Sequence, residues 1–188
     1  LKVLENPVSQ NDTSIRAHLK IDTGMGRMGI RYEDIDSIVA KLSKSKNIVI
    51  EGIYSHFSTA EEKNTEYRDW QLKRFKEVVV RIKESLPRVE YVHMANSAAV
   101  LTCPEALFNM VRPGILLYGV TPLGEPHEDL FPVMRMKAPI TLIKKFNTGE
   151  SIGYNRKYIL EKNENIAIIQ AGYADGIPVE FSNRGEVE

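Results

Sequence analysis

Cysteine, net charge and long apolar runs are all scarce in this chain, and each shortage excludes a class of protein. The single cysteine, Cys103, allows no internal disulfide, which favours a reducing compartment and makes the cytoplasm the expected location. The 25 basic and 25 acidic side chains cancel, so no nucleic acid or membrane partner is expected. No apolar run approaches the roughly 18 residues of a membrane span, and residues 1–16 are too polar for a secretory signal.

Several common catalytic and binding motifs are also missing. No set of cysteine and histidine residues has the spacing of metal ligands, so no metal is expected. The chain contains neither a Gly-x-Ser-x-Gly elbow nor a Walker loop. It does contain 43% hydrophobic residues in a length of 188, enough for one large domain or two small ones with a packed core.

Strand and helix patterns alternate over the first two thirds of the chain. The predicted strands are 18–22, 48–57, 89–95 and 111–120. The predicted helices are one of about a dozen residues that opens near 33–34, one over 67–86 and a short one after a cap at 96–97. Strands separated by helices imply right-handed crossovers. They predict an α/β fold with a parallel sheet, either open or closed into a barrel.

Three prolines and a glycine between residues 122 and 132 predict a stiff linker. Beyond it the helical period disappears, and the segments 134–146 and 165–172 have the composition of strands. We therefore expect an α/β unit over residues 1–131 and part of a separate β domain over residues 132–188.

A glycine-rich loop follows the first predicted strand. Glycines at 24, 26 and 29 surround Arg27. Such a loop can bring a planar, permanently charged donor close to an anionic or phenolic oxygen. The segment also matches the Gly-x-Gly-x-x-Gly pattern of dinucleotide-binding folds, although its third glycine precedes the predicted helix and an arginine fits poorly beside a pyrophosphate. A plain tight turn with a solvated arginine is the third interpretation.

Four further side chains are candidates for chemistry. His56 could stack on a flat cofactor or act as an acid or base, although a structural histidine is the simpler interpretation. Ser97 and its neighbouring amides could bind a phosphate or only cap a helix. Arg112 stands in an apolar segment and needs a partner, for which an internal carboxylate is the simplest choice. Tyr154 lies on a turn and would need a nearby positive charge to act as a base.

Taken in order, these segments resemble the alanine racemase family. The matching motifs are LKIDTGMGR at 19–27, SHF at 55–57, HMANSAA at 93–99, NMVRPGI at 109–115, GY at 153–154 and GYADG at 172–176. That family depends on pyridoxal 5'-phosphate and has an N-terminal (β/α)8 barrel and a C-terminal β domain. The resemblance therefore implies part of a TIM-type barrel over 1–131, followed by part of the β domain.

The resemblance implies roles around the pyridoxal ring. Arg27 would donate to the phenolic oxygen, and Lys20 matches a lysine that is often carbamylated and orients that arginine. His56 would stack against the ring. Arg112 would face the pyridine nitrogen and keep it unprotonated, because the pKa of a guanidinium is too high for it to give up a proton. That arrangement weakens the cofactor as an electron sink and should suppress side reactions.

The resemblance also implies groups for the phosphate and the substrate. The residues that would hold the phosphate are Asn96, Ser97, Gly114 and Ile115. Tyr154 would remove or return the α-proton on one face of the substrate, reaching the active site of the other subunit of a homodimer. Tyr173 and Glu61 would line the substrate entrance.

The implied activity is the interconversion of L-alanine and D-alanine by two bases on opposite faces of the substrate, which supplies D-alanine for peptidoglycan. A serine racemase of the same fold is the nearest alternative, because one hydroxyl in a small pocket changes selectivity only modestly. A non-catalytic pyridoxal-phosphate-binding barrel protein is the next, and a dinucleotide oxidoreductase is more distant.

The chain departs from the family pattern in several places. The N-terminal motif with the cofactor's lysine has no match, and neither do the late segments of the β domain, so we expect a fragment that is inactive by itself. Glu61 stands where the family commonly has an aspartate, and Val179 stands where an arginine is frequent.

Overall fold

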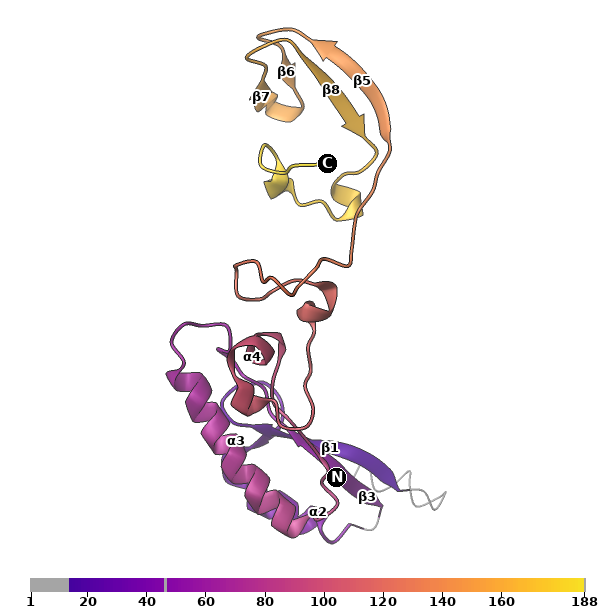
Figure 1. Cartoon of the computed structure of the whole chain (residues 1–188). Helices are drawn as coiled ribbons and strands as arrows, with labels where there is room; N and C mark the ends of the chain where they lie inside the picture. Colours follow the sequence, from indigo (N-terminus) through magenta and orange to yellow (C-terminus); the bar gives the residue numbers. More distant parts are fainter. Residues whose placement is uncertain (1–13, 46, 188) are drawn as a thin grey trace. The chain divides into compact units, whose positions relative to one another are not determined.

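The computed structural model describes residues 14–45 and 47–187, which form two compact units divided after Met134 (Figure 1). The α/β unit expected over 1–131 and the polar N-terminal segment both include residues 1–13, which lie outside the described residues. No helix in the described part of the chain is long and apolar enough to cross a bilayer.

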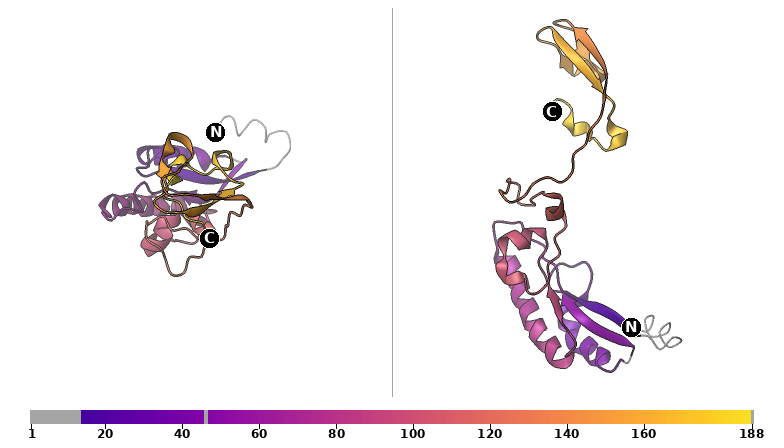
Figure 2. Two further views of the ribbon diagram at one scale, coloured as in Figure 1. Left: turned by 90° about the horizontal axis from the view of Figure 1, so that it is seen from above. Right: turned by 45° about the vertical axis from the view of Figure 1, so that its right-hand side comes forward.

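The first unit is built on a parallel sheet with the strand order β2-β1-β3-β4. Its strands are β1 (Ile15–Asp22), β2 (Ile30–Arg31), β3 (Ile48–Tyr54) and β4 (Tyr91–His93). Its helices are α2 (Ile35–Leu42), α3 (Glu66–Ser85) and α4 (Ser97–Thr102), with 3-10 segments at Tyr32–Asp34, Pro104–Ala106 and Ile115–Tyr118. Figures 1 and 2 show α3 lying along one side of β1 and β3. The parallel α/β arrangement and the predicted helices are confirmed.

The two faces of this sheet carry different side chains. Leu19, Ile53 and Val92 are in register on β1, β3 and β4. Ile53 and Val92 belong to the hydrophobic core, and the partly buried Leu19 packs against it. Side chains alternate along a strand, so the residues flanking these three point to the opposite face. The flanking residues are His18, Gly52 and Tyr91 in one row and Lys20, Tyr54 and His93 in the next. The face away from the core therefore carries polar and aromatic groups.

Helix α3 forms the other side of the core. Phe75, Val78 and Ile82 are fully buried, and their spacing of three and four residues places them on one face of the helix. Ile35 and Val39 of α2 are buried in the same cluster. The helices thus cover the apolar face of the sheet, and the polar and aromatic side chains lie on the opposite face.

Residues 111–120 do not form the strand that their apolar composition predicts. The chain is irregular at first and then forms the 3-10 segment Ile115–Tyr118. Pro113 has no N–H to donate to a strand ladder. Gly119 then turns the chain with a φ of 72°, and a Cβ there would lie 1.8 Å from a backbone carbonyl oxygen. A tight turn therefore replaces the predicted strand.

The second unit consists of β strands and short 3-10 segments. The strand β5 (Ile140–Phe146) pairs antiparallel with β8 (Glu164–Ile169), and β6 (Ser151–Ile152) pairs with β7 (Tyr158–Ile159). The 3-10 segments are Tyr154–Arg156, Tyr173–Asp175 and Val179–Phe181. The strands predicted at 134–146 and 165–172 are confirmed in part. The first begins only after Pro139, which cannot donate to a ladder.

Two valines on α3 provide a matched test of this packing. Val78 is fully buried and Val80 is 60% exposed. Val78→Ala should lower the free energy of unfolding by about 2 kcal/mol, because it removes buried methyl groups and leaves a cavity. Val80→Ala should leave it nearly unchanged. Urea unfolding followed by the fluorescence of Trp70, the only tryptophan, measures both. Equal losses at the two positions would contradict the assigned core face.

Candidate active site

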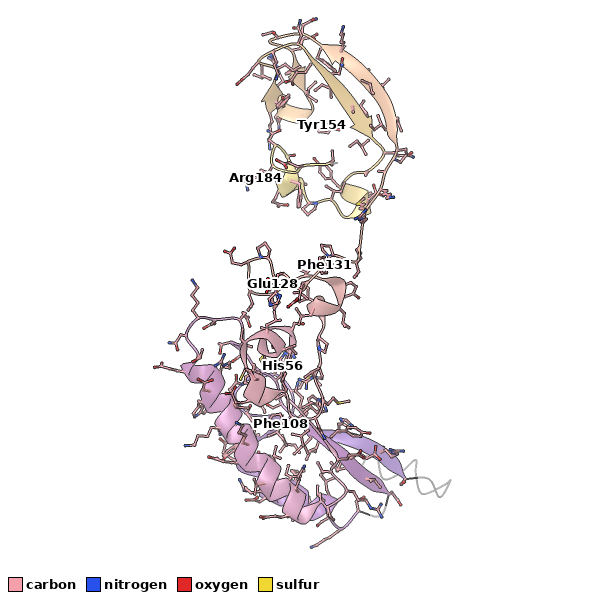
Figure 3. All side chains as sticks on the ribbon, viewed as in Figure 1. His56, Phe108, Glu128, Phe131, Tyr154 and Arg184 are labelled. Carbon is pink, nitrogen blue, oxygen red and sulfur yellow. The ribbon has the colours of Figure 1, made fainter. Side chains whose placement is uncertain are left out.

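Strands β1, β3 and β4 are parallel and end at the same edge of the sheet, and polar side chains gather there. His56 follows β3 at this edge and is labelled in Figure 3. Arg112 reaches His56 from a segment more than fifty residues away in sequence. Lys20 stands in the same row of the sheet as Tyr54. This edge is where barrel and open α/β enzymes place their chemistry.

Arg112 is held by neutral acceptors. Its two terminal nitrogens contact Nδ1 of His93 at 2.6 Å, the carbonyl oxygen of Ser55 at 2.7 Å and Nδ1 of His56 at 3.1 Å. The guanidinium also lies 5.1 Å from the ring centre of Tyr54. Among the described residues no acidic side chain pairs with it. The internal carboxylate, the simplest partner suggested by the sequence, is therefore not found there.

The two imidazoles beside Arg112 have lowered pKa values. Burial, then the charge of Arg112 and then His18, lowers the pKa of His93 from 6.5 to about 4. Burial also lowers the pKa of His56, and three nearby cations add to the effect. Those cations are Arg112, Arg27 and Lys20, whereas Glu61 acts in the opposite direction. Both rings are therefore neutral near pH 7 and can accept hydrogen bonds from a cation.

Hydrogen bonds from Asp22 at the end of β1 and from Tyr67 on α3 hold the glycine loop in place. The carboxylate of Asp22 accepts hydrogen bonds from the amides of Gly24 at 2.9 Å and Gly26 at 3.1 Å. The hydroxyl of Tyr67 donates to the carbonyl oxygen of Gly24 at 2.8 Å, and a Cβ at Gly24 would lie 2.6 Å from that hydroxyl. The Asp22 carboxylate thus occupies the amides that a pyrophosphate would need, which counts against the dinucleotide interpretation.

Arg27 lies in this loop as an exposed cation. Within the described residues it forms no ion pair or side-chain hydrogen bond. Burial, followed by the charges of Arg27 and Arg112, lowers the pKa of Lys20, while Asp22 opposes the shift. The edge therefore holds an excess of positive charge. Nowhere in the described ranges do three acidic, histidine or cysteine side chains come together as a group that could hold a metal.

The start of α4 and the turn after Arg112 meet at Ser97. The hydroxyl of Ser97 accepts a hydrogen bond from the amide of Gly114 at 2.8 Å. The helix cap is the side chain of Asn96, which accepts from the amide of Ala99 at 3.0 Å. The hydroxyl proton of Ser97 is therefore not needed for capping and can be donated to an anion.

The remaining predicted site residues are exposed. Glu61 follows β3 in the first unit. Tyr154, 90% exposed, and Tyr173, 63% exposed, belong to the second unit. Tyr154 begins a turn in which Asn155 and Arg156 both adopt positive φ, 58° and 52°, and Nε of Arg156 donates to the hydroxyl of Ser151 at 2.9 Å. Figure 3 labels Tyr154 beside the short strands of that unit.

Comparison with known proteins finds two family models along the chain. Residues 1–122 match the alanine racemase N-terminal domain, and residues 133–188 match the alanine racemase C-terminal domain. The chain belongs to the alanine racemase family. It is 41% identical over 174 residues to the alanine racemase of Citrifermentans bemidjiense, a match that covers 90% of this chain and 46% of that protein.

Solved racemase structures agree with this assignment. The alanine racemase of D-cycloserine-producing Streptomyces lavendulae matches with a TM-score of 0.85 at 32% identity, covering 98% of this chain and 50% of that one. The alanine racemase of Bartonella henselae, with covalently bound pyridoxal phosphate, gives a TM-score of 0.77 at 27% identity and covers 94% and 48%. The chain spans about half the length of the curated relatives it matches.

Family membership confirms the predicted fold class, part of a TIM-type racemase barrel followed by part of a β domain. In such a barrel the helices lie outside the strands. The face with Lys20, Tyr54 and His93 is therefore the interior of the racemase barrel, and Leu19, Ile53 and Val92 face the helical layer.

The structure adds three side chains that the motifs alone did not single out: His18, Tyr54 and the ring of His93. His93 stacks on Tyr54 with ring centres 4.9 Å apart and planes 4° from parallel. The signal was present as alternation, because 18 and 20, 52 and 54, and 91 and 93 flank an apolar residue on each strand. Register between strands far apart in sequence was needed to join them.

The pKa of His93 predicts how the stability of the first unit depends on pH. The unfolded chain binds a proton below about 6.5, while the folded chain excludes it until about pH 4. The free energy of unfolding therefore falls as the pH drops from 6.5 to 4, on the order of 1–3 kcal/mol from this residue. His56, shifted in the same direction, adds to the loss.

Unfolding in urea at a series of pH values tests this dependence. His93→Gln should flatten the slope between pH 6.5 and 4, because the variant lacks the titrating ring. An unaltered slope in the His93 variant would contradict a neutral His93.

Proposed function

We propose that the full-length protein carrying this chain interconverts L-alanine and D-alanine with pyridoxal 5'-phosphate as its cofactor, and so supplies D-alanine for peptidoglycan. The observation that carries the proposal is the half-buried guanidinium of Arg112, which only neutral groups hold in the described part of the chain. Membership of the alanine racemase family supports it.

The residues at the sheet edge fit the polar groups of this cofactor. The hydroxyl of Ser97, fixed by the amide of Gly114, suits a phosphate, and the amide of Ile115 begins the next turn beside it. Arg27 suits a phenolic oxygen and Arg112 a pyridine nitrogen, because a guanidinium has donors only. When bound, the cofactor supplies the electron withdrawal that makes the α-proton of the amino acid removable.

Arg112 limits that electron withdrawal. Its guanidinium keeps its own protons, so it hydrogen-bonds a pyridine nitrogen without protonating it. The neutral ring of His56 accepts from Arg112 and leaves its flat face for stacking. A weakened electron sink favours the return of the proton over transamination or decarboxylation. These residue types therefore suit racemisation better than other reactions of the same cofactor.

Tyr154 is our candidate for one of the two bases. Its phenol is almost fully exposed on a turn whose conformation Arg156 and Ser151 hold. A phenol needs a nearby positive charge to act as a base near neutrality. We propose that the full-length protein is a homodimer in which Tyr154 serves the site of the other subunit, with Tyr173 and Glu61 at the substrate entrance.

Lys20 is a candidate for carbamylation. Burial and two neighbouring guanidiniums lower its pKa, which raises the fraction of neutral amine that can attack carbon dioxide. The product would carry a negative charge beside Arg27 and offset the excess of positive charge. We place the protein in the cytoplasm, because a single cysteine suits a reducing compartment.

The alternatives differ in what they leave unexplained. A serine racemase would use the same residues, and Glu61 and Val179, which depart from the family pattern at the entrance, are the positions where such a preference would arise. A non-catalytic cofactor-binding barrel would not need the match of residues 133–188 to the racemase C-terminal domain. Turnover of L-alanine and L-serine by the full-length protein separates the two racemases.

Tyr154→Phe tests the proposed base in the full-length protein. Racemisation should fall by about a hundredfold or more in both directions, because proton return to one face is lost. Exchange of the α-proton with D2O should fall for one enantiomer only, since the base on the other face remains. Tyr158→Phe, on the neighbouring strand, is the control. Loss of exchange from both enantiomers, or from neither, would refute the assigned role.

A further inference from the structure

A chain of three hydrogen-bonding side chains crosses the interior face of the sheet. Arg112 contacts Nδ1 of His93 at 2.6 Å, and Nε2 of the same ring lies 2.8 Å from Nδ1 of His18. The first contact belongs to the site described above. The second joins the site to a residue one row further from the carboxyl edge, on β1.

The direction of each bond in this chain follows from Arg112. A guanidinium has no acceptor, so Nδ1 of His93 must be without a proton. Since that ring is neutral, its single proton lies on Nε2. Nε2 then donates, and Nδ1 of His18 accepts. The reverse arrangement would place an N–H of His93 against an N–H of Arg112, and two donors would face each other.

Gly52 provides a separate indication that the His18 ring is placed for this contact. A Cβ at position 52 would lie 2.5, 2.6 and 2.7 Å from three ring atoms of His18. The φ of Gly52 lies outside the range that excludes other residues, so its backbone conformation does not demand glycine. The missing side chain leaves room for the ring to cross β3 and reach β4. Tyr91 then stacks on it, with ring centres 5.6 Å apart.

We propose that His18 is a positioning residue, which accepts a hydrogen bond from Nε2 of His93 and so holds Nδ1 of that ring on the guanidinium of Arg112. The consequence for racemisation rests on the proposed function, in which Arg112 meets the cofactor. The consequence for His93 does not depend on it. His18 touches neither the substrate nor the cofactor in this account and acts only through His93.

The hydrogen bond itself is measurable in the full chain without cofactor. Uniform 15N labelling should show Nδ1 of His93 unprotonated and Nε2 protonated, with a scalar coupling across the hydrogen bond to Nδ1 of His18. The chain has only four histidines, so single substitutions assign the signals. Absence of the coupling in the wild-type chain, or a proton on Nδ1 of His93, would overturn the proposal.

Two substitutions of His18 separate positioning from folding. His18→Asn places an amide oxygen where Nδ1 stands and should retain both the state of His93 and activity within about twofold. His18→Leu removes the acceptor. It should lower kcat of the full-length holoenzyme by roughly tenfold, the effect typical of lost outer-shell partners, with little change in KM. His127→Leu controls for the loss of a histidine.

Gly52→Ala should reproduce the effect of His18→Leu, because the new methyl group displaces the ring while the imidazole remains in the sequence. Thermal unfolding of each variant identifies any that fail to fold. An Asn variant as impaired as the Leu variant, with both folded, would refute positioning through the acceptor. If the wild-type holoenzyme racemised no amino acid while the coupling was present, the proposed function would fail and the role of His18 toward His93 would stand.

Discussion

The site depends on one half-buried cation, Arg112, that has no anionic partner among the described residues. Arg112 is half-buried beside two imidazoles and a carbonyl oxygen, and no described acidic group neutralises it. Burying a charge is costly unless polar groups replace its water. The neighbouring histidines must therefore remain neutral, which is the direction in which burial and the charge of Arg112 shift the pKa of His93. The remaining positive charge is available for an electron-rich ligand.

The same three strands support stability and chemistry. Alternation assigns Leu19, Ile53 and Val92 to the core and leaves their neighbours on the interior face. A one-residue slip in any strand would exchange the two sets. Packing of the helices against the apolar face thus fixes the register that brings Lys20, Tyr54 and His93 into one row on the interior face. The positions of the side chains on the interior face therefore depend on the packing of the core on the opposite face.

Local sequence predicts some of this structure and misses the rest for identifiable reasons. Helix α3 follows from its apolar spacing and the following proline, and motif order along the chain predicts the family. The strand predicted at 111–120 is wrong because that prediction rested on apolar composition alone and did not take into account that Pro113 lacks the N–H that a strand ladder needs. The partners of Arg112 could not be derived locally, since Ser55 and His56 are more than fifty residues away. They become neighbours only in the folded chain, where the amide of Arg112 donates to the carbonyl oxygen of Ala95, just after β4.

A crystal structure of the full-length protein with pyridoxal 5'-phosphate is the most direct test of the central claim, that Arg112 keeps its charge for the cofactor. We expect a guanidinium nitrogen of Arg112 within hydrogen-bond distance of the pyridine nitrogen, with the contact to His93 retained and Arg27 on the phenolic oxygen. A carboxylate at the pyridine nitrogen, or Arg112 paired with an acidic residue from the rest of the protein, would contradict it.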